Sequence, residues 1–208
     1  MCQLTHEGEP RNVFDPSLEL TALLGERIYT RRLLLRRIRE ADLPLILAWS
    51  NSEIAYGPYL TPERHTARGL EDQLARNCLW NRHDKTFIVE NRGSGRPLGT
   101  IHYWLKQGQF ESAVVSIKIA EPRERRRGYG TEAQKYLIIH LFDQIGVKRV
   151  EMYTDIDNKP QQRCLTKLGF SIVESLTYDD HQVVRTGHLF QLTETDFRKQ
   201  ATYQFHYE

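Results

Sequence analysis

The stretch PRERRRGYGTEA, residues 122–133, decides the fold. Four of its first six residues are arginine, Gly128 and Gly130 follow two positions apart, and an apolar-periodic run begins after Ala133. The first turn of a helix leaves unpaired N–H groups and a positive dipole end, which bind phosphate where no side chain blocks the approach. Glycines remove that block, and arginines add charge-assisted contacts. The stretch therefore predicts a diphosphate-binding loop between a strand and a helix. The alternative is a turn with a solvated basic face.

The composition of the whole chain indicates one globular domain with an extension. It has 208 residues, of which 39% are hydrophobic and 27% charged, and a net charge of +2. Because the basic character is local, general nucleic-acid binding is not expected. No apolar run approaches the ~18 residues of a membrane span, and the first residues lack the order of a signal peptide. We therefore expect a cytoplasmic protein with no membrane partner.

The cysteines give no sign of a disulfide framework or a zinc site. Cys2, Cys78 and Cys164 are odd in number, widely spaced and form no CxxC pair. Reduced thiols of this kind are typical of cytoplasmic proteins. No group of His, Cys and Asp residues has metal-ligand spacing, so no metal is expected.

Hydrophobic periodicity predicts an α+β domain over residues 28–195, with an extension at 1–27 and a tail at 196–208. RRLLLRR, residues 31–37, predicts a strand near a sheet edge whose long arginine stems lie along its neighbours. Asp42 is the expected N-cap of the next helix. The remaining pattern predicts helices at 66–80, after Gly130 as far as Gly146, and at 160–169, and strands at 86–91, 97–105, 112–120, 148–155, 170–176 and 183–192. Together these give a mostly antiparallel mixed sheet with a central strand–loop–helix–strand unit.

Another nucleotide-binding fingerprint has to be weighed. Residues 128–133 fit G-x-G-x-x-A, and acids follow at Glu151 and Asp155, which is formally a dinucleotide motif. In that motif the first glycine follows its strand almost directly, whereas residues 121–127 intervene here. Too little chain follows for a doubly wound sheet. No P-loop motif is present.

Several motifs resemble the Gcn5-related N-acetyltransferase (GNAT) superfamily. RRRGYG, residues 125–130, matches its [RQ]-x-x-G-x-[GA] pyrophosphate loop. GYGTEA before an apolar helix resembles the RimJ/RimL-like branch, as does LLLRRIREADL, residues 33–43. Asn158 followed by LTKLGF, residues 165–170, resembles that branch's closing motif. The resemblance spans about residues 28–192 and implies a three-layer GNAT-like fold.

The resemblance also implies the cofactor, acetyl-CoA, and its binding residues. The cofactor would lie in a splay between the strands at 112–120 and 148–155. Backbone groups of Ile117, Lys118 and Ile119 would hold the pantetheine, with one N–H in an oxyanion-hole role. Asn158 would contact the cofactor or an ordered water; the alternative is an Asn in the turn before Pro160. The diphosphate would be held by Arg125, Arg126, Arg127, Gly128, Tyr129, Gly130 and Thr131.

The implied reaction is attack of a neutral amine on a thioester, and the chain offers several candidates for the base. His102, Tyr153 and Asp155 are the catalytic candidates, with Glu111 as a further one. The familiar donors to the departing thiolate are missing. Leu165 stands where many family members have Tyr, and Gln161 stands where the RimL-like motif has Ser.

The predicted function is an acetyl-CoA-dependent N-acetyltransferase that modifies a primary amine of a small molecule or a protein N-terminus. A homodimer is compatible with this function. One alternative is a non-catalytic acyl-CoA-binding module. Another is an RNA- or ribosome-binding protein that uses the two arginine-rich stretches, although the interleaved exposed aromatics typical of single-strand binding are missing.

Overall fold

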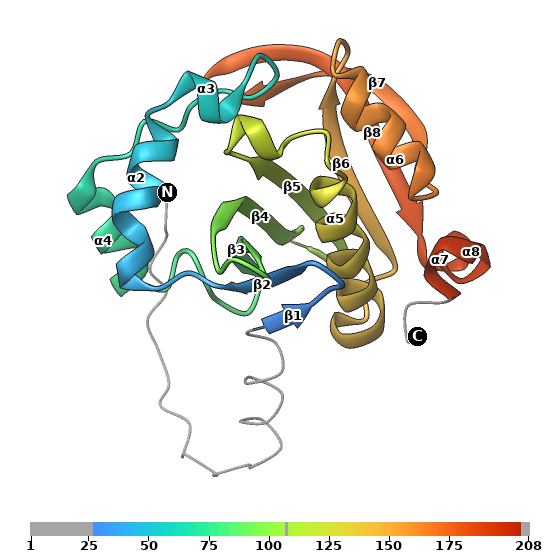
Figure 1. Ribbon diagram of the computed structural model, residues 1–208. Helices are drawn as coiled ribbons and strands as arrows, with labels where there is room; N and C mark the ends of the chain where they lie inside the picture. Colours follow the sequence, from blue (N-terminus) through green and yellow to red (C-terminus); the bar gives the residue numbers. More distant parts are fainter. Residues whose placement is uncertain (1–26, 107, 205–208) are drawn as a thin grey trace, which may run out of the picture.

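The computed structural model describes residues 27–106 and 108–204, which form an eight-stranded sheet covered by helices (Figure 1). The strand order is β1-β2-β3-β4-β5-β6-β8-β7. Among the described strands, β5 and β6 form the one parallel pair, so the mostly antiparallel mixed sheet is confirmed. The strands are β1 Arg27–Tyr29, β2 Leu33–Arg37, β3 Asp84–Asn91, β4 Pro97–Lys106, β5 Gln109–Ile119, β6 Arg149–Asp155, β7 Ser171–Asp180 and β8 Val183–Thr193.

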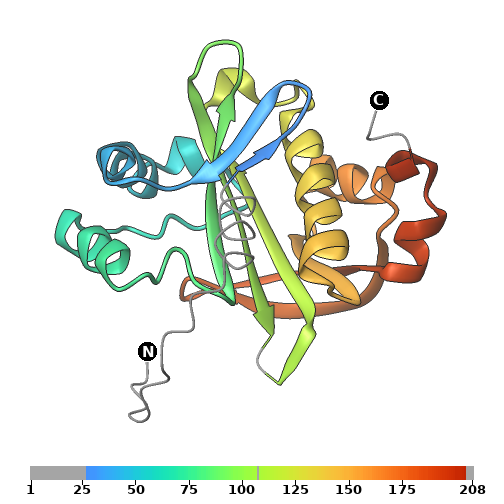
Figure 2. The same ribbon diagram turned by 90° about the horizontal axis from the view of Figure 1, so that it is seen from below.

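Helices cover both faces of the sheet and give three layers (Figure 2). On one face lie α5 (Tyr129–His140), α6 (Lys159–Lys167), α7 (Glu194–Lys199) and α8 (Ala201–Gln204), over the larger hydrophobic core. The other face carries α2 (Leu43–Ser50), α3 (Glu53–Tyr56) and α4 (Ala67–Ala75), over a second core. No helix within the described residues is both long enough and apolar enough to cross a membrane.

Strand alternation assigns the side chains to these two faces. On β4, Ile101 and Tyr103 are fully buried in the core under α5, while His102 and Trp104 point to the face of α2–α4. The same alternation places Lys118 of β5 and Tyr153 and Asp155 of β6 on the α2–α4 face, since Met152 lies in the α5 core. Side chains from different strands are thereby brought to one surface.

The arginines of β2 are partly structural. Arg36 is only 8% exposed, and its guanidinium bonds both carboxylate oxygens of Asp42 at 2.8 and 2.9 Å and Glu90 at 2.6 Å. Asp42 precedes α2 as predicted, but its carboxylate makes no capping bond to that helix. It accepts instead from Arg36 and from the backbone N–H of Arg39 at 2.8 Å. Hydrogen bonding to Asp42 raises the pKa of Arg36.

The structure describes most of the predicted C-terminal tail but almost none of the predicted N-terminal extension. The predicted extension lies outside the described residues except for Arg27, which begins β1. At the other end, Phe197 stacks on Phe142 with ring centroids 4.5 Å apart, and the Tyr203 hydroxyl donates to the Leu168 carbonyl at 2.9 Å. Phe197 and Tyr203 therefore pack into the core, so α7 and α8, which begin within or just before the predicted tail, belong to the domain.

Candidate active site

The sheet opens between β5 and β6. These strands pair over Ser112–Val114 and Arg149–Glu151 only. Beyond this point β5 stays paired with β4 as far as Ile119, and β6 stays paired with β8 as far as Asp155. The facing edges of residues 115–119 and 152–155 therefore have no strand partner, and their backbone groups are available to a ligand, except the Ile119 carbonyl, which accepts from Arg125. This is the splay that the family resemblance implied, and it contains Ile117, Lys118 and Ile119.

A glycine-rich helix start lies beside the splay. Gly128 caps α5 in the left-handed region, with φ +82°, and Arg126 has φ +62°. A Cβ placed on Gly130 would lie 3.9 Å from side-chain atoms of Ile117 and Ile119. Gly130 therefore stands where the first turn of α5 meets the open part of β5. Its missing side chain leaves bare backbone there, which fits a diphosphate continuing into a pantetheine arm.

The four arginines of the loop have different partners. The Arg125 guanidinium donates to the carbonyl oxygens of Ile119, Ile54 and Ala55 at 2.8, 2.6 and 2.6 Å, and so ties the loop to α3. Arg127 pairs with Glu124 at 3.0 Å. Arg123 and Arg126 are exposed and make no ion pair within the described residues. The side chain of Arg125 is thus engaged in the fold, and Arg126 is the arginine of the predicted set that is open to an anion.

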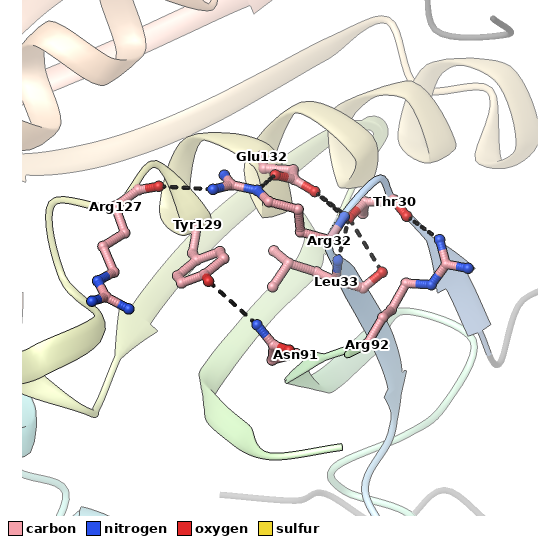
Figure 3. A network of polar contacts seen from close by, with 8 residues as sticks. All are labelled: Thr30, Arg32, Leu33, Asn91, Arg92, Arg127, Tyr129 and Glu132. Atoms are coloured by element: carbon pink, nitrogen blue, oxygen red, sulfur yellow. Dashed lines mark hydrogen bonds and ion pairs between the residues drawn. The ribbon is translucent and has the colours of Figure 1, made fainter. Parts of the chain in front are cut away.

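A partly exposed ion pair between Glu132 and Arg32 anchors the start of α5 to the β1–β2 turn (Figure 3). Glu132 accepts from the Thr30 hydroxyl at 2.6 Å and from the backbone N–H and Nε of Arg32, both at 2.7 Å. Arg32 also donates to the Arg127 carbonyl at 3.1 Å. Burial alone would raise the pKa of Glu132, but the bonds from Thr30 and Arg32 outweigh it and lower that pKa. The loop is therefore held in place by residues about 100 positions away.

Tyr129 belongs to the same anchor. The Arg32 guanidinium lies 4.6 Å from the centroid of its ring, and its hydroxyl accepts from Asn91 at 3.3 Å (Figure 3). The Tyr129 side chain is therefore held against Arg32 and Asn91. Its backbone N–H, in the first turn of α5, is what this residue can offer a diphosphate.

A polar cluster joins α5 to α6 beside the splay. The Thr131 hydroxyl lies 3.1 Å from the Cys164 sulfur. Gln161, which stands in place of the branch's Ser, donates to Gln134 at 2.7 Å, and Gln134 donates to the Gly130 carbonyl at 2.9 Å. Gln161 is thus linked to the loop backbone through one side chain. Leu165, in place of the family's Tyr, is fully buried in the core.

Asn158 caps α6, as its alternative interpretation predicted. Its Oδ1 accepts from the Gln161 backbone N–H at 3.2 Å. Within the described residues its Nδ2 has no hydrogen-bond partner, so the cap leaves both N–H donors of the amide for a ligand. On β6, the Thr154 hydroxyl is buried and has no hydrogen-bond partner among the described residues.

The predicted catalytic residues are only partly brought together. Tyr153 and Asp155 lie on the edge of the splay, on the α2–α4 face. The Tyr153 ring centroid is 5.6 Å from that of Tyr178. His102 lies on the same face but one strand further on, and its Nε2 is 2.7 Å from Asp84 on β3, which draws the ring away from β5. Glu111 is exposed near the start of β5, just before the residues that pair with β6 and away from the open part of the strand.

Asp155 is part of an ionic link between the β7–β8 hairpin and the loop after α3. Arg185 pairs with Asp155 at 3.3 Å and with Asp180 at 2.8 Å. It also donates to the Thr61 hydroxyl at 3.1 Å, and Asp180 accepts from the Thr61 N–H at 2.8 Å. The hairpin is therefore fastened to the loop after α3 on the α2–α4 face of the splay.

A second cluster on this face was not predicted from the sequence. The Lys118 ammonium lies 3.7 Å from the centroid of the Tyr56 ring. The Tyr56 hydroxyl donates to Glu63 at 2.8 Å, and the other Glu63 oxygen is 2.6 Å from Nε2 of His65. Burial alone would raise the pKa of Glu63, but the bond from His65, the charge of Lys118 and the bond from Tyr56 lower it to about 2. Glu63-x-His65 is a weak signal, and nothing in the sequence relates it to Lys118.

Comparison with known proteins agrees with this geometry. Residues 32–171 match the family described as "Acetyltransferase (GNAT) domain". The chain belongs to the GNAT family. Acetyl-CoA is the donor typical of the GNAT enzymes.

Two curated relatives are N-acetyltransferase 9-like proteins. The one from Caenorhabditis briggsae is 30% identical over 116 residues, which are 50% of this chain and 59% of that protein. The one from Schizosaccharomyces pombe is 37% identical over 82 residues, covering 35% and 38% of the two chains. The matches thus span less than two thirds of either relative. The crystal structure of aminoglycoside acetyltransferase AAC(6')-Ib with coenzyme A superposes with a TM-score of 0.65 at 19% identity, covering 81% of this chain and 98% of that one, and shows a shared GNAT fold.

Proposed function

We propose that this GNAT protein is an acetyl-CoA-dependent N-acetyltransferase that acts on a primary amine of a small molecule or a protein N-terminus. The observation that carries the proposal is the β5–β6 opening, with the bare first turn of α5 on one side and a carboxylate-bearing face on the other. We also retain, as proposals, membership of the RimJ/RimL-like branch, a cytoplasmic location and a homodimer.

The residues present fit acetyl-CoA. Backbone groups of Ile117, Lys118 and Ile119 would hold the pantetheine arm, and residues 126–131 would hold the diphosphate through backbone N–H groups and the Arg126 side chain. When bound, acetyl-CoA supplies the activated acetyl group. An N–H of the open β5 edge would stabilise the negative charge that develops on the thioester carbonyl oxygen. Holding both reactants in this opening supplies several kcal/mol of rate acceleration.

On the acceptor side, the chain's own residues attract and hold an amine. Glu63 stays ionised at neutral pH because its pKa is about 2, and it draws an ammonium group toward the opening. Tyr153 and Asp155 border the same space and are the proposed proton acceptors, directly or through water. His102 would need to leave Asp84 to take part.

The alternative is a non-catalytic acyl-CoA-binding module. It is favoured by the replacement of both familiar thiolate donors: Leu165 has no titratable group, and Gln161 offers only an amide. Native mass spectrometry of the purified protein tests the shared part of both functions. A retained CoA species is the expected result. Failure to bind either CoA or acetyl-CoA would refute both.

Replacing Arg126 with glycine is expected to weaken CoA binding by about tenfold to a hundredfold, because one charge-assisted contact is worth about 1.5–3 kcal/mol. Stability should change by less than about 0.5 kcal/mol, since glycine adopts the φ of +62° without steric cost. Calorimetric titration and thermal unfolding measure the two effects. The control is Arg68→Ala, which removes an arginine from the remote surface of α4. Alanine is used there because a glycine would also weaken the helix. Equal CoA affinity in Arg126→Gly and Arg68→Ala would contradict the assignment.

A further inference from the structure

Lys118 is the amine that the fold places at the β5–β6 opening. Of the residues on the open edges, 115–119 and 152–155, it is the only lysine. Its side chain leaves β5 on the α2–α4 face, opposite to Val115, Ile117 and Ile119, which pack in the core under α5. The backbone of the same residue lies where the pantetheine arm is proposed to bind. The structure holds the amine over the Tyr56 ring, so it reaches a thioester beside its own backbone by a change of side-chain rotamer.

The Lys118 amine is surrounded by side chains of α3, of the loop after α3, of β4 and of the loop after β5. Tyr56 on α3 stacks under it at 3.7 Å, and Glu63 from the following loop acts on its charge from beyond hydrogen-bond distance. Across the strand pair, Thr100 of β4 is uncharged. Arg125 lies in the loop after β5, and its guanidinium donates to backbone carbonyls of α3 and β5. The Lys118 amine therefore makes no direct ion pair with these neighbours.

This environment favours the reactive form of the amine. Burial lowers the pKa of Lys118 to about 8, and the charge of Glu63 only partly opposes this. At pH 7 about one Lys118 side chain in ten is then neutral, against about one in a few thousand for a lysine of ordinary pKa. A neutral amine is the nucleophile that a thioester requires.

We propose that Lys118 is an internal acetyl acceptor, which takes the acetyl group from bound acetyl-CoA when no external amine occupies the acceptor face. The proposal rests on the proposed function, because it uses the same cofactor site. In the step, the neutral Nζ attacks the thioester carbonyl carbon. A C–N bond forms and the C–S bond breaks, and CoA leaves as a thiolate that receives the proton lost by Nζ. No oxidant or further co-reactant is needed.

Acetylation at this position would change the acceptor face. The amide formed carries no positive charge, so it loses the cation–π contact with Tyr56. Glu63 then loses the neighbouring charge that lowers its pKa, while its bonds to Tyr56 and His65 remain. The face becomes more negative and more attractive to an acceptor ammonium.

The test uses the full chain, acetyl-CoA and no added amine. Peptide mass spectrometry follows acetylation of Lys118 over time and compares it with Lys199, whose side chain is 71% exposed on α7. We expect Lys118 to be modified at least about tenfold faster, with a rate that rises between pH 6.5 and pH 8.5 as the amine is deprotonated. Modification of Lys118 no faster than Lys199 would overturn the proposal.

Two controls separate this result from simple chemical acetylation. Lys118→Arg keeps the positive charge and removes the acceptor, so the fast phase seen in the intact mass should disappear. S-acetyl-N-acetylcysteamine has the same thioester but no diphosphate, so at equal concentration it should label Lys118 much more slowly than acetyl-CoA does. Selective labelling of Lys118 by this truncated thioester, as fast as by acetyl-CoA, would also overturn the proposal.

A separate measurement tests the proposed function. Native mass spectrometry of the same samples reports whether CoA binds. A protein that binds acetyl-CoA and acetylates an external amine, but leaves Lys118 unmodified, refutes the internal acceptor alone. Absence of CoA binding refutes the proposed function itself.

Discussion

Arg36→Ala is expected to lower the free energy of unfolding by about 3–5 kcal/mol, because it leaves two carboxylates without their counter-charge. The side chains of Arg36, Asp42 and Glu90 are only 9%, 10% and 18% exposed. Removing one member of such a group is more costly than the group's net contribution, since the remaining charges stay desolvated. Urea denaturation at pH 7 measures the loss.

Two matched variants show whether burial is the cause. Arg36→Lys should lose less than Arg36→Ala, because a lysine keeps the charge but cannot bond both Asp42 oxygens in a fork. Arg96→Ala removes an arginine that also pairs with a carboxylate, Glu121, but is 58% exposed, and should lose less than about 1 kcal/mol. Equal losses in Arg36→Ala and Arg96→Ala would contradict a buried network.

Local signals were sufficient to predict the framework of the fold. Alternation in residues 97–105 and 112–120 identified β4 and β5, and Gly146, with φ +78°, ends the helical run after α5 as predicted. The loop at 122–133 was recognisable because glycine at a helix start has a specific physical use. These features depend on neighbours in the sequence.

What could not be predicted depends on contacts between distant residues. Asp42 was expected to cap α2, but Arg36 and the Arg39 N–H take its carboxylate. Tyr56 and Lys118 meet only because α3 packs on the open part of β5. Such pairs follow from register and packing, which no single-sequence pattern contains.

Gly130→Asp is expected to weaken CoA binding by about a hundredfold or more, equivalent to about 3 kcal/mol. The new side chain would point into the space between the first turn of α5 and the side chains of Ile117 and Ile119, 3.9 Å from the Cβ position. There its carboxylate would occupy the proposed diphosphate site and repel the ligand. The empty protein should stay folded, since an acidic residue in the first turn favours the helix dipole.

Gly130→Asn and Gly130→Ala are the controls for this variant. Asn has the size of Asp without its charge, so the difference between the two isolates repulsion from steric exclusion. Ala adds only a Cβ, at ordinary contact distance from its neighbours, and should have the smallest effect. Isothermal titration with CoA, alongside circular dichroism of each variant, measures the series. A folded Gly130→Asp protein with unchanged CoA affinity would contradict the placement of the diphosphate.

The most direct test of the central claim is release of free CoA thiol from acetyl-CoA, followed with a panel of amines that includes polyamines, aminoglycosides and short peptides with free N-termini. We predict that the wild-type protein releases thiol faster with at least one amine present, that the same amine gains an acetyl group in the mass spectrum, and that Gly130→Asp loses the effect. Tight CoA binding by the wild type, with no amine-dependent thiol release across the panel, would contradict an N-acetyltransferase of this acceptor class and favour the acyl-CoA-binding module.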